Sequence, residues 1–319
     1  MQPPSRRTVL SLGLLTTLTA CTSGSDEHHT TAEPPRDPDT PARLRAVAAT
    51  DRLLGAYDEL LAAPGARTAL LQPLREDTAQ HRAALVQGLL TASASGSDTP
   101  APTATPAGPA ATLATLADLA ALAALERRSA DSHLHDLEEV GPDLARLLAA
   151  IAASEALHAA ALGDQTPVAA PEGRTATNPA ATAAAVPAIQ TALGAEHAAV
   201  YGYGVVGAHL PDDRQRADAR GTHAAHQARR DAWQRLLVTA AASPAPAAGG
   251  YQLPFPVASP ADATRLALHL ETRLTTVYAD LVATLPAPYR PRAATALCET
   301  ALCARQWGAP ATAFPGVPG

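Results

Sequence analysis

The sequence predicts an all-α protein built from two tandem four-helix bundles. Three observations support this. Apolar residues make up 47% of the 319 residues and aromatic residues only 3%, so alanine and leucine, which favour helices, provide most of the apolar side chains. These side chains recur at the three- and four-residue steps of helices that bury one face. Short and long connections also follow one another in the same order twice along the chain.

The first segment precedes both bundles. Arg6 and Arg7 are followed by an uncharged stretch, residues 8–20, which is far shorter than the roughly 20 apolar residues of a membrane-spanning helix. We interpret residues 1–20 as a signal peptide. Residues 5–10, Ser-Arg-Arg-Thr-Val-Leu, resemble the twin-arginine export motif. An arginine pair also suits a general secretory signal, so both export routes remain open.

The end of this segment, Leu18-Thr19-Ala20-Cys21, resembles the lipobox of bacterial lipoproteins. The resemblance implies that Cys21 carries lipid and becomes the first mature residue. Each buried methylene contributes about 0.8 kcal/mol, so two acyl chains suffice for stable attachment. We therefore expect an exported protein, lipid-anchored to the outer face of the cytoplasmic membrane, with residues 21–41 as a tether. No other stretch is expected to span the bilayer.

The first bundle is expected over residues 42–163. Its predicted helices cover residues 42–62, 67–90, 111–140 and 142–162. Pro64-Gly65 and Gly141-Pro142 mark short turns between them. The second connection, residues 91–109, is long and consists largely of Ser, Pro, Thr and Ala. We expect it not to be helical.

The second bundle is expected over residues 181–319, after a linker at 164–180. Its predicted helices cover residues 181–209, 211–242, 260–285 and 288–307. Again only the middle connection is long, and the apolar residues of 251–256 suggest that it packs across the bundle. Two short hairpins joined by one long crossover between the second and third helices is the connectivity of ferritin-like four-helix bundles. The alternative is one irregular helical array.

Charge and cysteine content exclude some functions. The formal net charge of -6 gives no basic surface for nucleic acid, so we expect no nucleic-acid partner. Cys298 and Cys303 lie five positions apart on one predicted helix and point in different directions, which excludes a disulfide between them. We expect them to be packed as small residues.

Polar residues interrupt the apolar seams of the first predicted bundle. Residues spaced by three and four along a helix face the bundle interior. The second, third and fourth helices each place one acid and one histidine in this seam: Asp77 and His81, Glu126 and His133, and Glu155 and His158. The first helix is ambiguous, because Asp51 and Asp58 fit one phase and Tyr57 another. We assign no ligand there.

The second predicted bundle has a related pattern. Glu196 interrupts the seam of its first helix, His223 and His226 are in phase with apolar residues of its second, and Glu271 interrupts that of its third. Glu196 with Tyr203 mirrors Glu271 with Tyr278, as an internally duplicated helix pair would. His197 lies beside the same face.

These residues resemble a known family. Glu155-x-x-His158 is similar to the Glu-x-x-His half-motif of di-iron ferritin-like proteins. Residues 195–204, Ala-Glu-His-Ala-Ala-Val-Tyr-Gly-Tyr-Gly, resemble an actinobacterial ferritin-like family of unknown function that often occurs in lipoproteins, and residues 223–231 and 251–257 reinforce the match. The likeness is strong over about the last 130 residues, a domain-sized length, and looser before. It implies a ferritin-like fold and metal binding, but no substrate.

The chain also departs from the di-iron pattern. The second bundle has His223-x-x-His226 in place of Glu-x-x-His, and Leu302 stands three residues after Glu299 where a histidine would be expected. A complete di-iron site is therefore in doubt there. The first bundle has one full half-motif, with Asp77 and His81 as an imperfect second. A mononuclear or vestigial site fits equally well.

A buried carboxylate without compensation costs several kcal/mol, so these acids need partners. The candidate metal ligands are His81, Glu126, Glu155, His158, Glu196, His223, His226 and Glu271, with iron, manganese or zinc as the metal. The alternative is salt bridges to arginines such as Arg127, Arg128, Arg229 and Arg230, with no metal. The expected function is to bind or oxidise iron or a related metal at the cell envelope. The alternative is a non-catalytic helical lipoprotein with degenerate sites that binds an envelope partner. The sequence does not decide whether the chain is an enzyme.

Overall fold

A computed structural model of the chain describes residues 37–62, 67–95, 119–168 and 183–317. These residues form eight α-helices, two short 3-10 helices and no strand, which confirms the all-α prediction. Residues 36–319 form one compact unit. The predicted signal peptide, Cys21 and most of the tether lie outside the described residues.

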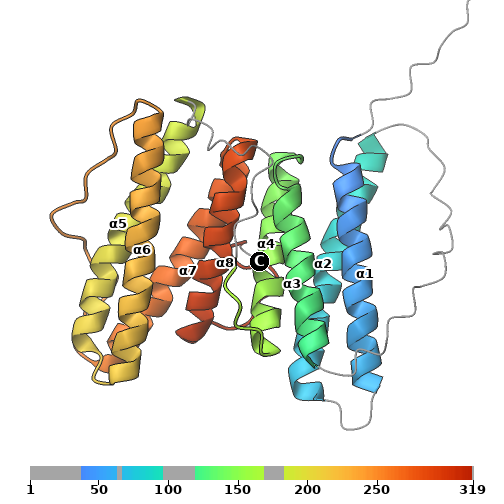
Figure 1. The fold of residues 1–319 in the computed structure, drawn as a ribbon, viewed down its shortest axis with the longest axis horizontal. Helices are drawn as coiled ribbons and strands as arrows, with labels where there is room; N and C mark the ends of the chain where they lie inside the picture. The colour runs from blue at the N-terminus through green and yellow to red at the C-terminus, as the bar shows by residue number, and fades with distance from the viewer. Residues whose placement is uncertain (1–36, 63–66, 96–118, 169–182, 318–319) are drawn as a thin grey trace, which may run out of the picture. The chain divides into compact units, whose positions relative to one another are not determined.

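The first four helices form one group (Figure 1). They are α1 (Thr40–Ala62), α2 (Thr68–Ser95), α3 (Leu119–Asp136) and α4 (Pro142–Ala161). Helix α1 packs against α2 and α3, and α4 packs against α3 and, over a smaller area, against α2. The only long connection in this group joins α2 to α3, as expected.

Two predicted boundaries in this group were wrong. Helix α2 continues to Ser95. Thr91, which was expected in the loop, lies in the helix, and its hydroxyl donates to the carbonyls of Gln87 (3.2 Å) and Gly88 (3.0 Å). The third helix ends at Asp136 instead of residue 140, because the chain turns there and the Glu139 N–H donates to the Asp136 carbonyl (3.0 Å). Residues 111–118 of that predicted helix lie outside the described residues.

The last four helices form a second group. They are α5 (Val186–His209), α6 (Asp213–Thr239), α7 (Pro260–Thr284) and α8 (Arg290–Gln306), with 3-10 turns at Ala183–Ala185 and Ala287–Tyr289. Helix α5 packs against α6 and α7, and α7 packs against α8. The Asp212 carboxylate accepts from the Gln215 N–H (2.9 Å) and so caps α6 two residues later than predicted. Cys298 is buried and both cysteines of α8 are free, which confirms that expectation.

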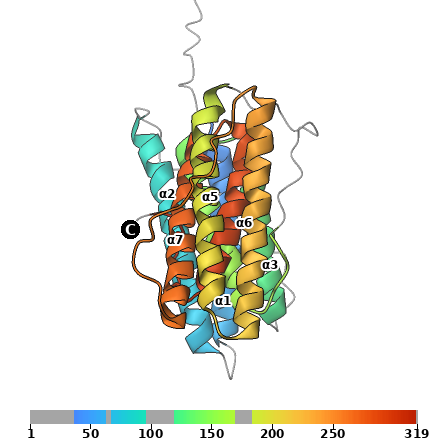
Figure 2. The same cartoon turned by 90° about the vertical axis from the view of Figure 1, so that its left-hand side faces the viewer.

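One hydrophobic core runs through both groups. Helix α4 packs against α7 and α8 as well as α3, and Figures 1 and 2 show the helices running along a common direction. Ile151 of α4 and Leu297 of α8 belong to the same buried cluster. Arg290 adds polar links by donating to the carbonyls of Leu137 (3.2 Å) and Val140 (2.5 Å). The described helices therefore fall into two groups that share one core.

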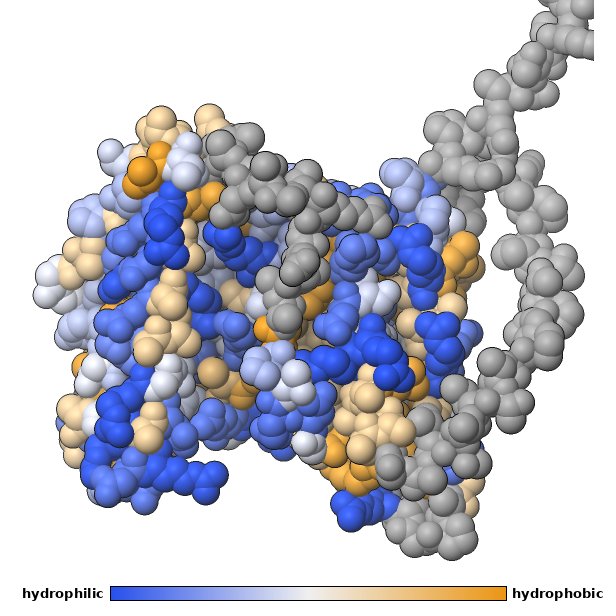
Figure 3. Space-filling model, viewed as in Figure 1, coloured by the Kyte–Doolittle hydropathy of each residue, from blue (hydrophilic) through white to orange (hydrophobic). Residues whose placement is uncertain are grey.

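Helix α4 contains a long apolar stretch that was not expected from the sequence. Among the described helices it alone is long and apolar enough to cross a membrane, contrary to the expectation that no such stretch follows the signal peptide. In the structure, however, 72% of that stretch is buried inside the protein. A helix that is apolar on all sides is typical of a core helix packed on every side. Figure 3 shows hydrophilic residues over most of one face of the molecule, with apolar residues in small groups.

Candidate functional site

The acids and histidines of the first group meet in its interior. Glu126 lies at the centre: its Oε1 accepts a hydrogen bond from the Tyr57 hydroxyl (2.5 Å) and lies 3.1 Å from His158 Nδ1. The other ring nitrogen of His158, Nε2, lies 3.5 Å from Asp77 Oδ2. Tyr57, Glu126 and His158 are all buried. One imidazole therefore bridges acids from α2 and α3.

Glu155 forms a second pair beside this one. Its Oε1 accepts from the Ser129 hydroxyl (2.8 Å) and lies 3.4 Å from His133 Nε2. All three side chains are buried. Glu155 thus pairs with a histidine of α3, although the Glu-x-x-His motif suggested that it acts together with His158.

His81 differs from the other two histidines. Its Nε2 lies 2.7 Å from the carbonyl oxygen of Ala313, and since a carbonyl only accepts, Nε2 carries the hydrogen. The ring stacks at 6.0 Å from that of His158. Burial, and next the charge of His158, lower the pKa of His81 to about 3. His81 is therefore neutral, with an unprotonated Nδ1.

We call these side chains the first cluster: Asp77, His81, Glu126, His133, Glu155 and His158. Four of its buried atoms have no hydrogen-bond partner among the described residues: Glu126 Oε2, Glu155 Oε2, His81 Nδ1 and His133 Nδ1. A buried polar atom left without a partner costs about 1–3 kcal/mol. Carboxylate oxygens and imidazole nitrogens are ligands for iron, manganese and zinc, so the donor set of the first cluster fits a metal ion.

Protons are held in the first cluster at neutral pH. Burial raises the pKa of Glu126. Burial alone would lower the pKa of His158, but Glu126 and Asp77 outweigh it and raise the value to about 9. In the same way burial opposes the charge of His133, yet Glu155 raises its pKa. The neighbouring carboxylates therefore favour the charged form of His158 and of His133.

The ion pairs leave no ready-made metal site. Within the described ranges, no three His, Cys, Asp or Glu side chains are grouped so that they could hold a metal ion. His158 and His133 stand against the carboxylates as protonated partners. A metal ion can enter the first cluster only if it replaces these protons and the side chains turn toward it.

The second group also buries acids, but with a different partner. His226 of α6 lies between two carboxylates: Nδ1 is 2.8 Å from Glu196 Oε2 and Nε2 is 3.0 Å from Glu271 Oε1. All three residues are buried. Burial opposes the charge of His226, but the hydrogen bonds to Glu196 and Glu271 raise its pKa. The imidazolium holds the acids of α5 and α7 together.

An arginine completes this second network. Arg229 Nε donates to Glu196 Oε1 (3.1 Å) and Nη1 donates to Glu299 Oε2 (2.5 Å). Burial would raise the pKa of Glu196, but His226 and Arg229 lower it. We call Glu196, His226, Arg229, Glu271 and Glu299 the second cluster. Its three acids pair with two side-chain cations, one of which cannot lose its proton.

Two tyrosines connect the helices of the second cluster crosswise. The Tyr203 hydroxyl donates to Glu271 (2.5 Å), and the Tyr278 hydroxyl donates to Glu196. The mirrored Glu–Tyr pairs expected from the sequence are therefore real, but each tyrosine binds the acid of the other helix. Within the second cluster only one buried oxygen, Glu271 Oε2, has no partner among the described residues.

The structure also places two further residues, His223 and Tyr57, relative to the clusters. His223 is only partly buried, and no hydrogen bond or ion pair of the second cluster involves it among the described residues, so the structure does not bring it together with Glu196 and Glu271. Tyr57 was left unassigned although it binds Glu126. The similar spacing of the two tyrosine–glutamate pairs could have indicated this contact, because Tyr57 precedes Glu126 by 69 residues and Tyr203 precedes Glu271 by 68.

Comparisons with known proteins concern the second group. Residues 188–319 match the family model described as Domain of unknown function (DUF4439). The crystal structure of a conserved hypothetical protein from Mycobacterium tuberculosis is 38% identical over 39% of this chain and 87% of that chain, with a TM-score of 0.38. A search of curated proteins found no match. Through residues 188–319, the chain belongs to the family of this domain of unknown function.

Proposed function

We propose that the chain is a ferritin-like lipoprotein of the cell envelope whose first cluster binds a redox-active or related metal ion, with iron as the first candidate and manganese or zinc as alternatives. One observation carries the proposal. Two carboxylate oxygens and two imidazole nitrogens of the first cluster are buried without a partner. A cation bound by such atoms would offset their desolvation.

Helix order supports the ferritin-like part. Within the first group α1 packs on α2 and α3, and α4 packs on α3 and α2, with the long connection between α2 and α3. This is the arrangement of a bundle with one crossover, in which carboxylates and histidines project inward from facing helices. The second group repeats the short-long-short order of connections.

Glu126, Glu155 and His81 each offer a buried atom without a partner and would hold the metal ion. His158 would join them after losing its proton and its pairing with Glu126 and Asp77, and Asp77 and His133 lie beside them. Tyr57 and Ser129 already fix one oxygen of Glu126 and of Glu155, which leaves the other oxygen of each carboxylate available. A bound iron ion would supply one-electron redox chemistry inside the bundle. The second cluster serves as scaffold, because Arg229 and His226 already balance its acids.

The test removes two ligands and keeps the fold. We expect a Glu155→Gln, His158→Ala variant to lose stoichiometric iron or manganese on elemental analysis. It should also lose the increase in melting temperature that Mn²⁺ gives the parent, since a ligand stabilises only where it binds. His135→Ala is the control, because His135 is an exposed histidine near the end of α3 and its removal should change neither readout.

Equal metal content and equal thermal shift in parent and double variant would reject the site. A parent that binds no metal would favour the second reading, a non-catalytic helical lipoprotein with degenerate clusters that contacts an envelope partner. These variants leave the buried side chains Leu144, Leu148 and Ile151 of α4 unchanged, and circular dichroism checks that each variant is folded.

The anchor is tested separately. Cys21→Ala removes the thiol that the lipobox resemblance assigns to lipid, and we expect the variant to move from the membrane to the soluble fraction. Cys303→Ala is the matched control, since Cys303 is a free cysteine of α8 and its loss should leave the protein on the membrane. Membrane association of the Cys21→Ala variant would contradict the lipid anchor.

A further inference from the structure

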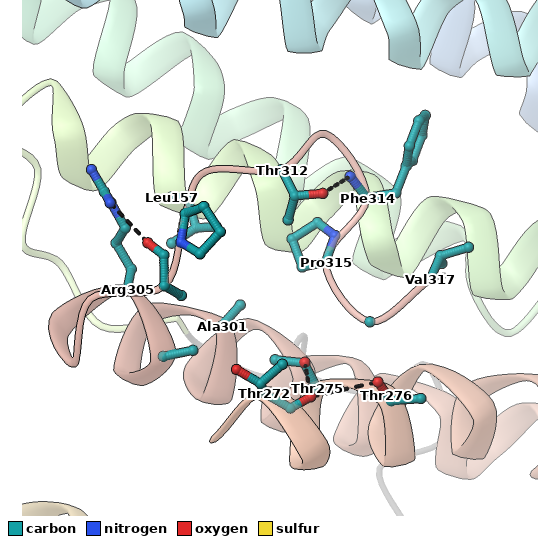
Figure 4. A pocket seen from close by; sticks show the side chains of 14 residues that line it. Leu157, Thr272, Thr275, Thr276, Ala301, Arg305, Thr312, Phe314, Pro315 and Val317 are labelled. Carbon is teal, nitrogen blue, oxygen red and sulfur yellow. Dashed lines mark hydrogen bonds between the residues drawn. The ribbon is translucent and has the colours of Figure 1, made fainter. Parts of the chain in front are cut away.

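The last described segment of the chain leaves the second group and contacts the first. Helix α8 ends at Gln306. Two residues later Gly308, with a φ of +100°, turns the chain, and the Ala309 N–H donates to the Ala304 carbonyl (2.9 Å). We call residues 309–317 the C-terminal tail. It covers a pocket of about 250 Å³ whose walls include Leu157 of α4 and Thr275 of α7 (Figure 4).

The tail reaches the first cluster through its backbone. The Ser154 hydroxyl of α4 donates to the Thr312 carbonyl (3.4 Å), and His81 of α2 donates to the Ala313 carbonyl (2.7 Å). The Phe314 ring packs edge-on against His81, with centroids 5.4 Å apart. Figure 4 shows this ring pointing away from the threonines of α7. The tail thus joins α4 and α2, which contact each other directly over only a small area.

We propose that the C-terminal tail positions His81 as a metal ligand of the first cluster. The Ala313 carbonyl accepts the Nε2 hydrogen and so fixes the tautomer in which Nδ1 carries the lone pair, and that buried Nδ1 has no partner. Histidines that bind metals commonly donate their other ring N–H to a backbone carbonyl or carboxylate in this way. This inference rests on the proposed function, because it assigns a part of the same site.

The C-terminal tail packs closely against α7, so a side chain added at this contact can displace the tail. Gly316 has a φ of +78°, and a Cβ at this position would lie 2.4 Å from the Thr275 carbonyl oxygen. Any side chain at Gly316 therefore forces the tail away from α7. Gly316→Ala changes neither cluster, so it separates displacement of the tail from loss of a ligand.

The experiment uses the full chain with three changes to the tail. They are Gly316→Ala, Phe314→Ala and a truncation after Pro310, with Val317→Ala as the control, because Val317 lines the pocket without contacting His81. Circular dichroism checks that each variant is folded. Three readouts follow. They are the nitrogen chemical shifts of His81 in metal-free protein labelled with ¹⁵N-histidine, assigned with His81→Gln; the affinity for Mn²⁺ by calorimetry; and the rate at which diethyl pyrocarbonate modifies His81.

We expect His81 of the parent and of Val317→Ala to be a single tautomer with a protonated Nε2. Gly316→Ala and the truncation should lose this single tautomer, and their Mn²⁺ affinity should fall by about 10–100-fold, as for other lost partners of metal-binding histidines. Phe314→Ala should expose the His81 ring and so raise the rate at which diethyl pyrocarbonate modifies His81.

Identical His81 shifts in the parent, Gly316→Ala and the truncation would overturn the inference. Equal affinity for Mn²⁺ in the parent and the truncated chain would also overturn it. A parent that binds no Mn²⁺ defeats the proposed function instead, and the tail is then judged by the nitrogen shifts alone: a changed tautomer keeps its positioning role, and an unchanged one removes it.

Discussion

The two helical groups contain the same tyrosine–glutamate pair but balance their buried charge differently. Tyr57 donates to Glu126 in the first group, as Tyr203 does to Glu271 in the second. In the second cluster Arg229 supplies a cation that bonds Glu196 and Glu299. Among the described residues of the first cluster, Glu126 and Glu155 form ion pairs with histidines only.

This difference has a chemical consequence. Arginine keeps its proton at any ordinary pH, whereas histidine loses its proton and becomes a metal ligand. The second cluster therefore holds a permanent cation where a ferritin-like site would need a metal ion. The first cluster holds exchangeable protons. The resemblance to a family motif does not distinguish the two groups. The cations that pair with their buried carboxylates do.

The helix registers show where the groups diverge. Two turns before the tyrosine, the first helix of each group has Thr50 and Glu196, respectively. Two turns after the glutamate, the third helix has His133 and Tyr278. Thr50 donates to its own helix, to the Ala46 carbonyl (2.9 Å). The first group thus lacks the acid on its first helix and gains a histidine on its third.

The largest expected effect is loss of the permanent cation. Arg229→Met leaves Glu196 and Glu299 without their arginine, and removal of one partner from a buried ion pair costs about 3–5 kcal/mol of unfolding free energy. Urea unfolding measures it. Arg230→Met is the control, since the pair with Asp231 is partly exposed and should cost less than about 1 kcal/mol. Equal losses in both variants would remove the distinction between the clusters.

The shared tyrosines give the next effect. Tyr57→Phe and Tyr203→Phe each remove one hydrogen bond to a buried carboxylate, and such bonds to charged groups contribute about 1.5–3 kcal/mol. Without metal the two losses should be similar. With Mn²⁺ present, only Tyr57→Phe should also lower metal affinity, measured by calorimetry. A metal effect of Tyr203→Phe instead would assign the metal to the second cluster.

A pH profile tests the second cluster with a smaller effect. The pKa of Glu196 is lowered, so its contribution to stability is present above its unfolded value and is lost as pH falls through the folded value. The pKa of His226 is raised, so its contribution is complete below its unfolded value and is lost as pH rises through the folded value. Stability from this network should therefore peak between the unfolded values of 4.5 and 6.5.

Glu196→Gln should flatten the acid side of that profile, as measured by the midpoint of urea unfolding at each pH. Glu299→Gln is the comparison, because Glu299 is partly exposed and should change the profile less. A parent-like loss of stability on the acid side in Glu196→Gln would show that other acids dominate it.

Much of the fold and part of the site could be predicted from the sequence. Helical spacing identified all eight helices, and the seam positions of Glu126, Glu155, Glu196 and Glu271 are buried as expected. Seam phase predicts the face on which a side chain lies, but not its partner. That is why Glu155 was grouped with His158 instead of His133. It is also why His223, about 60° around the helix from His226, was placed in the same set although it is only partly buried.

Contacts between distant segments could not be predicted in this way. The Ala313 carbonyl meets His81 across 232 residues, and a tail of Ala, Pro, Thr, Phe, Gly and Val has no periodicity that indicates its position. The core shared by the two helical groups, in contrast, was indicated by the sequence of α4. Residues 148–156 of α4 are all buried, and a helix that is apolar on all sides predicts neighbours on all sides.

The most direct measurement is calorimetric titration of metal-free protein with Mn²⁺ in the parent and two matched variants. Glu155→Gln, His158→Ala changes the first cluster, and Glu271→Gln, His226→Ala changes the second. The parent and the second-cluster variant should bind Mn²⁺ with the same stoichiometry, and the first-cluster variant should bind none. Loss of binding in the second-cluster variant alone, or equal binding in all three proteins, would contradict the assignment of the metal to the first cluster.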